Sequence, residues 1–223
     1  MTKKLVFVHT MPALVGLFTE LAQEILDDDV EVWHIADEVL LRAVLAAGGL
    51  TPFVHHRVAE HAMAAEQAGA DVVQLTCSSI SPCADIAQAL VDIPVLKVDE
   101  PMVDQALSLG RRIGVAATVS TTLKPTSELV RTRAAALGKQ VEVETMLCEG
   151  AYTALRAGDL ETHDRLVRAT VLELSSRNEV VVLAQASMAR ALEALGPAEK
   201  SVPILSSPRL AIERAKAVLS RKG

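Results

Sequence analysis

The sequence is poor in aromatic residues and cysteines, and it contains no long apolar run and no basic stripe. With three Phe, one Trp and one Tyr in 223 residues, any core has to be built from Ala, Val, Leu and Ile. A net charge of −6 without a basic stripe argues against nucleic-acid binding. No apolar run approaches the ~20 residues that a membrane-spanning helix needs. Nucleic acids and membranes are therefore not expected partners.

The three cysteines, Cys77, Cys83 and Cys148, form neither a CxxC pair nor the spacing of a Cys/His zinc site. Their odd number in a mid-sized chain also argues against a disulfide framework. We expect reduced thiols, no metal and no other cofactor. The amino-terminal segment imitates a signal peptide, but a histidine and a proline interrupt its apolar run. We therefore expect a cytoplasmic protein.

Two segments about half a chain apart follow one pattern: an acidic residue, an apolar strand and a small polar turn. Residues 71–79 read DVVQLTCSS, and residues 179–187 read EVVVLAQAS, 108 positions later. The apolar run at 5–10 recurs at the same offset, at 113–118. The remaining expected strands pair in the same order, 31–35 with 142–146 and 93–96 with 202–205. This repetition indicates a duplicated unit.

Each half alternates expected strands with segments of helical spacing, which predicts a parallel sheet covered by helices on both faces. The strands are short apolar runs, as expected when both faces of a sheet are buried. We predict an α/β protein of two pseudo-symmetric parallel-sheet halves, with the active site in the cleft between them. The first half is residues 1–97 together with a returning last helix, 206–223, and the second is residues 98–205.

Four loops follow expected strands at their carboxyl ends, where open parallel sheets bind ligands. These loops are rich in hydroxyl groups and small residues, and the amino ends of expected helices follow them. The free backbone N–H groups and the helix dipole at such ends suit a carboxylate. The four loops are 9–12, 76–82, 118–122 and 184–188.

Cys77 is the candidate for chemistry because it has no cysteine counterpart in the second half. We expect it at a helix start, where a thiol has a lowered pKa and appreciable thiolate near neutral pH. The alternative is an inert buried cysteine, the commonest fate of this residue type. The neighbouring Thr76, Ser78 and Ser79 favour function, since a packing cysteine does not need them.

Three motifs resemble those of the aspartate/glutamate/hydantoin racemase superfamily. Residues 76–79 (TCSS) resemble the first cysteine motif, and residues 114–121 (GVAATVST) resemble the loop that binds the substrate carboxylate. Residues 183–188 (LAQASM) resemble the second cysteine motif, with Gln185 in place of the cysteine. The resemblance covers essentially the whole chain. It implies two similar α/β halves, an active site between them, no cofactor and a homodimer.

The resemblance also implies the site residues. Cys77 and Gln185 take the two catalytic positions, although glutamine cannot replace a cysteine as a proton donor. Gln185 can instead hydrogen-bond a developing enolate or hold a carboxylate. The expected substrate-binding residues are His9, Thr10, Ser78, Ser79, Thr118, Thr121, Thr122 and Ser187.

Three functions remain open at this point. The first is racemase or isomerase chemistry on a small carboxylate such as an amino acid, with Cys77 as acid/base and His9 or Cys148 supplying the second proton. The second is a single-cysteine lyase that decarboxylates a malonate-like acid, as arylmalonate decarboxylases of this superfamily do. The third is a ligand-binding homologue that has lost catalysis.

Overall fold

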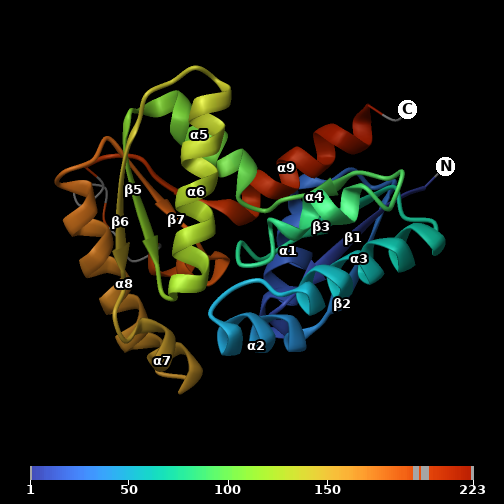
Figure 1. The fold of residues 1–223 in the computed structure, drawn as a ribbon, viewed down its shortest axis with the longest axis horizontal. Coiled ribbons are helices and arrows are strands. Elements are labelled where there is room, and N and C mark those ends of the chain that lie inside the picture. The colour runs from blue at the N-terminus through green and yellow to red at the C-terminus, as the bar shows by residue number, and fades with distance from the viewer. Residues whose placement is uncertain (1, 193–195, 197–200, 222–223) are drawn as a thin grey trace. The chain divides into compact units, whose positions relative to one another are not determined.

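The computed structural model describes residues 2–192, 196 and 201–221, and the chain divides into two compact units (Figure 1). Unit 1 comprises Met1–Asp99 and Pro208–Gly223, and unit 2 comprises Glu100–Ser207. Each unit is an α/β domain with its own four-stranded parallel sheet. The predicted fold class, two α/β halves with parallel sheets, is confirmed.

The sheet of unit 1 contains β1 (Lys3–His9), β2 (Val30–Ala36), β3 (Val72–Leu75) and β4 (Val95–Leu96). The strands lie in the order β2-β1-β3-β4, and every neighbouring pair is parallel. The second strand, β2, lies on one side of β1, and the later strands, β3 and β4, lie on the other side. The order therefore reverses between β1 and β3, which makes the carboxyl ends of these two strands the expected ligand position.

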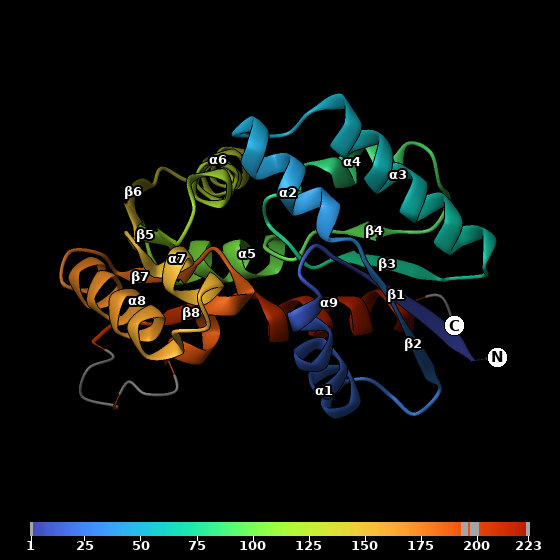
Figure 2. The same cartoon turned by 90° about the horizontal axis from the view of Figure 1, so that it is seen from below.

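Helices cover both faces of this sheet (Figure 2). One face carries α2, α3 and α4, and the other carries α1 and α9. Alternation along β1 explains the two layers: Val6 and Val8 pack into the α2–α3–α4 core, whereas the Phe7 ring lies 5.3 Å from the Phe18 ring of α1. The helical segments are η1 (Pro12–Leu14), α1 (Val15–Ile25), α2 (Glu38–Ala47), α3 (Pro52–Gln67), α4 (Cys83–Gln88) and α9 (Ser207–Ser220).

The carboxyl-terminal helix α9 belongs to unit 1 although it follows unit 2 in the sequence. Arg209 of α9 pairs with Glu24 of α1 at 2.7 Å. Lys216 pairs with Asp27 just beyond α1 at 2.6 Å and also donates to the Ile25 carbonyl. These exposed ion pairs contribute little stability. Most of the contact comes from the apolar stripe of α9, in which Ala211, Ile212 and Ala215 are fully buried.

Unit 2 repeats the same sheet. It contains β5 (Arg112–Ala117), β6 (Glu142–Leu147), β7 (Val180–Leu183) and β8 (Ile204–Ser206). Their order, β6-β5-β7-β8, is that of unit 1 with each strand replaced by its predicted repeat partner. The repeat that was visible in the sequence is therefore a repeat of topology.

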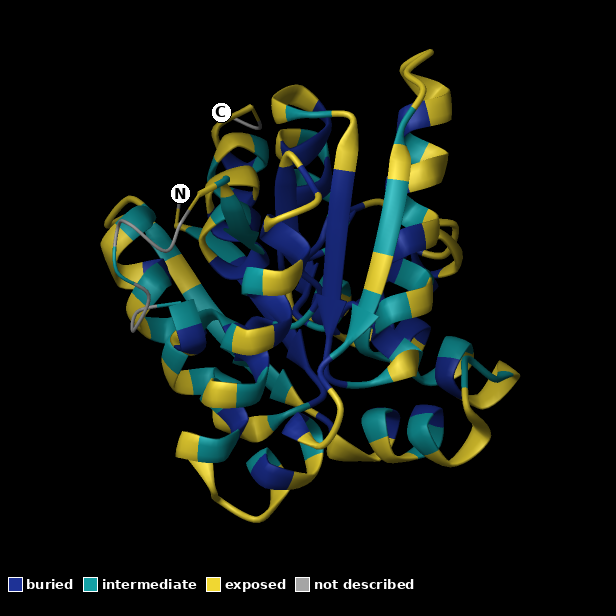
Figure 3. Cartoon of the chain, turned by 90° about the vertical axis from the view of Figure 1, so that its left-hand side faces the viewer, coloured by how far each residue is buried: buried dark blue, intermediate teal, exposed yellow. Residues whose placement is uncertain are grey.

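The central strand β5 of unit 2 is buried over nearly its whole length, whereas the edge strand β6 is partly exposed (Figure 3). Gly114 of β5 allows α8 to pack closely, because an added Cβ would lie 3.2 Å from the Leu174 Cβ. The helical segments of this unit are α5 (Glu100–Leu109), α6 (Ser120–Ala136), α7 (Ala151–Arg156), α8 (Leu160–Ser175) and η2 (Ala186–Leu192).

Helix α6 begins earlier than the sequence suggests. The Lys124-Pro125 pair predicts a start near residue 123, but the helix starts at Ser120 and Pro125 lies inside it. The Val119 carbonyl accepts hydrogen bonds from the Thr122 and Leu123 N–H groups, which forms the first turn. Pro125 is the sixth residue of the helix and has no N–H, so the hydrogen bond that this position would make to the carbonyl of residue 121 is missing. The threonines at 121 and 122 therefore belong to a helical first turn.

No helix in the described part of the chain is both long enough and apolar enough to cross a membrane.

Candidate active site

In unit 1, the reversal of strand order brings the ends of β1 and β3 together. His9 ends β1 and is followed by Thr10, while β3 ends at Leu75 and is followed by Thr76 and Cys77. The Thr76 N–H donates to the Val8 carbonyl at 3.1 Å, which extends the β1–β3 contact past the end of the strand. As a residue, Cys77 is partly exposed, whereas Thr10 and Thr76 are buried.

Cys77 does not start a helix, contrary to the prediction. A series of turns separates it from α4, which begins at Cys83. The Ile80 N–H donates to the Cys77 carbonyl at 3.1 Å, and the Ser81 N–H donates to the Ser78 carbonyl at 3.3 Å. Ser78 and Ser79 are buried in this turn. We call residues 76–82 the Cys77 turn.

The pKa of the Cys77 thiol is raised, so the predicted thiolate near neutral pH is wrong. Burial is the largest cause, since it penalises the charged form. The Thr10 and Ser79 hydroxyls and the N–H groups of Ser79 and Ile80 act in the opposite direction and favour the thiolate. The resting thiol is therefore protonated, and the groups that would stabilise a transient thiolate already surround it.

Asp99 lies behind the Cys77 turn and was not singled out from the sequence. It follows β4, and only 1% of its surface is exposed. Burial raises its pKa to about 6, against the opposing effect of hydrogen bonds from the Ser81 and Ser78 hydroxyls. Its Oδ1 atom has no hydrogen-bond partner within the described structure. The available signal was the Asp-Glu-Pro sequence at 99–101, which indicates a helix start or, for Glu100, an acid/base, and gives Asp99 itself no role.

His9 is fully buried, and both of its ring nitrogens are engaged. Nδ1 lies 3.0 Å from the Thr76 hydroxyl, and Nε2 lies 2.9 Å from Nδ1 of His34 on β2. Burial, with a smaller contribution from His34, lowers the pKa of His9 to about 4. His9 therefore supports the Cys77 turn from behind and does not offer a free ring nitrogen to a substrate. His34 was not identified from the sequence.

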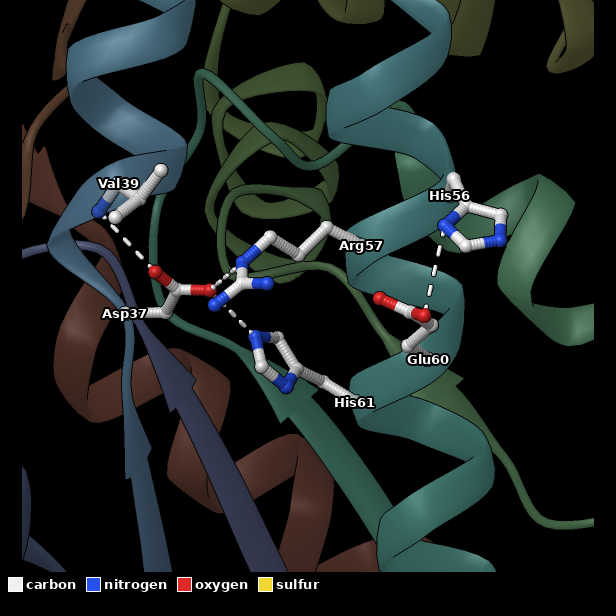
Figure 4. Close-up of polar contacts among 6 residues, drawn as sticks. All are labelled: Asp37, Val39, His56, Arg57, Glu60 and His61. Carbon is white, nitrogen blue, oxygen red and sulfur yellow. Dashed lines mark hydrogen bonds and ion pairs between the residues drawn. The ribbon is translucent and has the colours of Figure 1, made fainter.

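A second polar cluster holds the helices above the β2 end of the same sheet edge (Figure 4). Asp37 Oδ1 accepts from the Val39 N–H and caps α2, while its Oδ2 lies 2.5 Å from Arg57 Nε and 2.7 Å from His61 Nε2 of α3. Burial raises the pKa of Asp37, but the bonds from His61 and Arg57 outweigh it, and the net direction is downward. We call these three side chains the Asp37 cluster; it ties α2 to α3.

In unit 2, Thr118 and Gln185 stand at the equivalent reversal between β5 and β7. The Gln185 Oε1 atom accepts two hydrogen bonds from Thr118, one from the backbone N–H at 2.5 Å and one from the hydroxyl at 2.9 Å. An N–H group can only donate, so the atom facing it must be the amide oxygen. The amide nitrogen is consequently the donating end of Gln185.

The other expected residues of unit 2 lie near this pair in the sequence but have different surroundings. Thr121 and Thr122 belong to the first turn of α6, and Ser187 belongs to η2. The Thr121 and Ser187 hydroxyl oxygens are buried and have no partner in the described part of the structure. Cys148 follows β6 and packs in the apolar core beside α8, where burial raises its pKa. This is the environment of a packing cysteine.

A sequence model of the Asp/Glu/hydantoin racemase family matches residues 20–215. The chain belongs to this family. The resemblance predicted from the cysteine and threonine motifs is thereby confirmed. Family membership supports an enzyme with racemase-type, that is isomerase, activity. No curated protein matches the sequence.

Solved structures with similar folds carry several activities. Glutamate racemase from Bacillus anthracis has a TM-score of 0.75 at 18% identity, with 99% of this chain and 83% of that chain covered. Allantoin racemase from Klebsiella pneumoniae has a TM-score of 0.69 at 15% identity, with 99% and 89% covered. Arylmalonate decarboxylase has a TM-score of 0.62 at 14% identity, with 99% and 94% covered. At such identities the likeness concerns the fold alone.

Proposed function

We propose that this racemase-family protein catalyses cofactor-independent proton transfer at the α-carbon of a small carboxylate, with Cys77 as the acid/base. The observation that supports the proposal best is the environment of the thiol. Cys77 is partly open, whereas the groups that favour its thiolate are buried around it. A packing cysteine has no need of neighbouring hydroxyl and N–H groups that favour its thiolate.

The raised pKa defines how such a thiol works. In the resting protein it holds a proton and can give it to a carbanion or enolate. The thiolate that this step leaves is then stabilised by the Thr10 and Ser79 hydroxyls and by the N–H groups of Ser79 and Ile80. In the opposite direction, the same thiolate removes an α-proton. One thiol therefore serves both directions of proton transfer at carbon.

Gln185 is proposed to bind the substrate through its amide nitrogen. Its oxygen is committed to Thr118, which fixes the orientation of the amide and turns the N–H₂ group away from the strand end. An amide donor can bind a carboxylate or a developing enolate but cannot supply a proton to carbon. The prediction that the loops of both units serve one ligand stays a prediction.

Decarboxylation of a malonate-like acid is the second candidate. Two observations favour it: the second cysteine position holds Gln185, and the remaining thiol is protonated at rest. Loss of carbon dioxide generates an enolate without a base, so a single proton donor then suffices. Neither His9 nor Cys148 offers an obvious second donor, because His9 is engaged through both nitrogens and Cys148 lies in the core.

The test is hydrogen–deuterium exchange at the α-carbon, followed by NMR in D₂O over a panel of amino acids, hydroxy acids and substituted malonates. We expect exchange or decarboxylation with wild type and with Cys83→Ala, and none with Cys77→Ala. Cys83 is a matched control because it is a fully buried thiol at the start of α4, with a pKa raised to about 12. Activity that survives in Cys77→Ala would contradict the proposal. Product configuration and carbon dioxide release separate the two reactions.

A further inference from the structure

Asp99 is a buried carboxyl group that makes no ion pair within the described residues, although only 1% of its surface is exposed. Lys97, two residues earlier, pairs instead with Asp85 of α4 at 2.7 Å. The charge of Lys97 affects the pKa of Asp99 less than the neighbouring serine hydroxyls do. A buried carboxylate without a cation costs stability, and an apolar side chain at this place would avoid that cost. Packing alone therefore does not account for Asp99.

The hydrogen-bond partners of Asp99 come from the Cys77 turn. The Ser81 and Ser78 hydroxyls are buried and donate to its carboxyl group. Because the pKa of Asp99 is about 6, the group is a carboxylate at neutral pH and can accept both hydrogens. The Ser81 hydroxyl also lies 3.5 Å from the Cys77 carbonyl, but it has a single hydrogen to donate. A bond to an ionised acceptor is the stronger one, so Asp99 takes this hydrogen.

The backbone of the Cys77 turn sets which of its side chains lie on the same side. Its hydrogen bonds join residues three apart: the Ile80 N–H donates to the Cys77 carbonyl, and the Ser81 N–H donates to the Ser78 carbonyl. Side chains three residues apart lie on one side of such a 3₁₀-type turn. Ser78 and Ser81 therefore share the side that binds Asp99. Cys77 and Ile80 share another side, which packs against the α2–α3–α4 core.

Other groups of the same turn favour the Cys77 thiolate. They are the hydroxyl and N–H groups of Ser79 and the N–H group of Ile80. Ser78 and Ser81 stand on either side of these two residues in the sequence, and consecutive hydrogen bonds connect all four. A contact that fixes the two outer serines therefore also fixes the two residues between them.

The register of the sheet explains why Asp99 lies next to this turn. The parallel strands β3 and β4 pair Gln74 with Leu96, and Cys77 and Asp99 each follow three residues later. Both residues therefore come directly after the carboxyl ends of neighbouring strands.

The strands of unit 2 lack a carboxyl group at the equivalent place. There β7 and β8 pair Val182 with Leu205, and the residues three positions later are Gln185 and Pro208. The helical segment η2 follows Gln185 directly, and the Gln185 side chain is held by Thr118. The buried carboxyl group thus accompanies the thiol and not the amide.

We propose that Asp99 is a positioning residue for proton transfer by Cys77. By binding Ser78 and Ser81, it holds the Cys77 turn so that the two residues between these serines stay where their N–H groups favour the thiolate. The inference rests on the proposed function, in which Cys77 changes its protonation state. Asp99 acts through the turn and touches no reacting atom. The stability that its burial costs is the counterpart of a preorganised thiol environment.

The anchoring can be tested without a substrate, by amide hydrogen exchange followed by NMR in the full chain. Asp99→Leu has a similar size but no acceptor, so the Ile80 and Ser81 N–H groups, which close the turn, should exchange roughly tenfold faster. The Thr76 N–H, which donates to the Val8 carbonyl, is the internal reference and should not change. Asp99→Asn keeps one acceptor oxygen, should show a smaller change in the same direction, and carries the test if Asp99→Leu does not fold. Unchanged exchange of both turn amides would overturn the proposal.

The effect on chemistry is measured as α-proton exchange in an acid that wild type turns over. Asp99→Leu should lower kcat roughly tenfold with little change in KM, because it misplaces the acid/base without removing a substrate contact. Asp99→Asn should lower kcat less. Asp92→Leu, at an exposed position before β4, is the matched control and should change neither constant. A residue that only stabilises the fold would not separate kcat from KM in this way.

A double-variant cycle tests whether the effect passes through the turn. Ser81→Ala removes one of the two hydroxyls that bind Asp99, so Asp99→Leu should lower kcat by a smaller factor in Ser81→Ala than in wild type. Equal factors in the two backgrounds would mean that the two residues act independently, and would overturn the proposal.

Failure of the positioning role and failure of the proposed function give different results. Wild-type kcat in Asp99→Leu, together with complete loss of exchange in Cys77→Ala, would overturn the role of Asp99 and leave the proposed function intact. Exchange that survives in Cys77→Ala, or none on the whole panel, would overturn the proposed function and with it the positioning role.

Discussion

At equivalent points of their two sheets, unit 1 and unit 2 each have a threonine, but its neighbour differs. In unit 1, Thr10 follows β1 and its hydroxyl favours the thiolate of Cys77 after β3. In unit 2, Thr118 follows β5 and donates its N–H and its hydroxyl to Gln185 after β7. The threonine and the strand order are retained, and its partner is a thiol in unit 1 and an amide in unit 2. The duplicated fold therefore fixes the position of a site, and a single side chain fixes its chemistry.

The two units also differ in the residues that lie behind the turn after the third strand. Behind Cys77 lie the buried imidazole of His9 and the carboxyl group of Asp99, whereas the positions of His9 and Thr76 are alanines in unit 2. Buried polar groups are costly unless they are hydrogen-bonded. In the described part of the structure, Asp99 Oδ1 is such an unpartnered group in unit 1, and the Thr121 and Ser187 hydroxyls are such groups in unit 2.

The largest effect is expected when Cys77 of unit 1 is replaced by the glutamine that unit 2 has at the equivalent position, 185. Cys77→Gln should reduce α-proton exchange by about 10³-fold or more, because an amide neither gives nor takes a proton at carbon. The measurement is the NMR exchange assay, with circular dichroism to verify the fold. Exchange that persists in Cys77→Gln would show that the two units are chemically interchangeable.

Asp99 should make the stability of unit 1 depend on pH. Its pKa is raised from 3.8 to about 6, so between these values the folded chain keeps a proton that the unfolded chain has lost. Stability is therefore lost as the pH rises through this window, by about 3 kcal/mol. Asp99→Asn should become more stable than wild type by that amount between pH 4 and 7, measured by urea unfolding. A difference that does not vary with pH would contradict the assignment; Asp28→Asn, at an exposed position, is the control.

The caps of α2 and α8 can be compared, because Asp37 also accepts hydrogen bonds from Arg57 and His61, whereas Asp159 is a simple cap. Asp37→Ala removes a cap and leaves Arg57 and His61 without their shared acceptor, so it should cost about 2–3 kcal/mol. Asp159, which caps α8 through the Thr162 N–H at 3.0 Å, should cost about 1 kcal/mol when replaced by Ala. Equal losses in urea unfolding would mean that the two partners of Asp37 add nothing.

A smaller effect than that of Asp37→Ala is expected for the amide of unit 2. Gln185→Met removes the acceptor of the Thr118 N–H and hydroxyl, which should cost about 1–2 kcal/mol of unfolding free energy. Gln185→Glu keeps an acceptor oxygen and should cost less, while placing a negative charge against a carboxylate substrate. If Met and Glu destabilise equally, the two bonds from Thr118 do not stabilise the loop.

The topology could be predicted from the sequence because it depends on a repeated pattern. A buried strand followed by a polar turn recurs at 71–79 and 179–187, and the strand order repeats with it. Cys77 and Gln185 could be located in the same way, since each follows the third strand of its half. These predictions succeeded because each depends on residues that are close together in the sequence.

What could not be predicted depends on partners that are distant in the sequence. His9 meets His34 across 25 positions, and Asp37 meets His61 across 24. No periodicity identifies such pairs, so His34 and Asp99 were not recognised as parts of the site. The pKa of Cys77 was predicted in the wrong direction because burial, which depends on the folded structure, outweighs the nearby hydroxyl and N–H groups.

The two hydrogen bonds between Thr118 and Gln185 affect how closely a ligand could approach the strand ends of unit 2. A backbone N–H and a hydroxyl directed at one oxygen form a receptor for a carboxylate, and the amide oxygen of Gln185 fills that receptor from within the chain. The glutamine behaves as a spacer that receives hydrogen bonds on one side and offers donors on the other. An acid that binds to Gln185 must stop one amide width short of the strand end. Under the proposed function, a glutamine at the place of the cysteine leaves less room for substrate and supplies no proton donor, so we expect a smaller acid to bind.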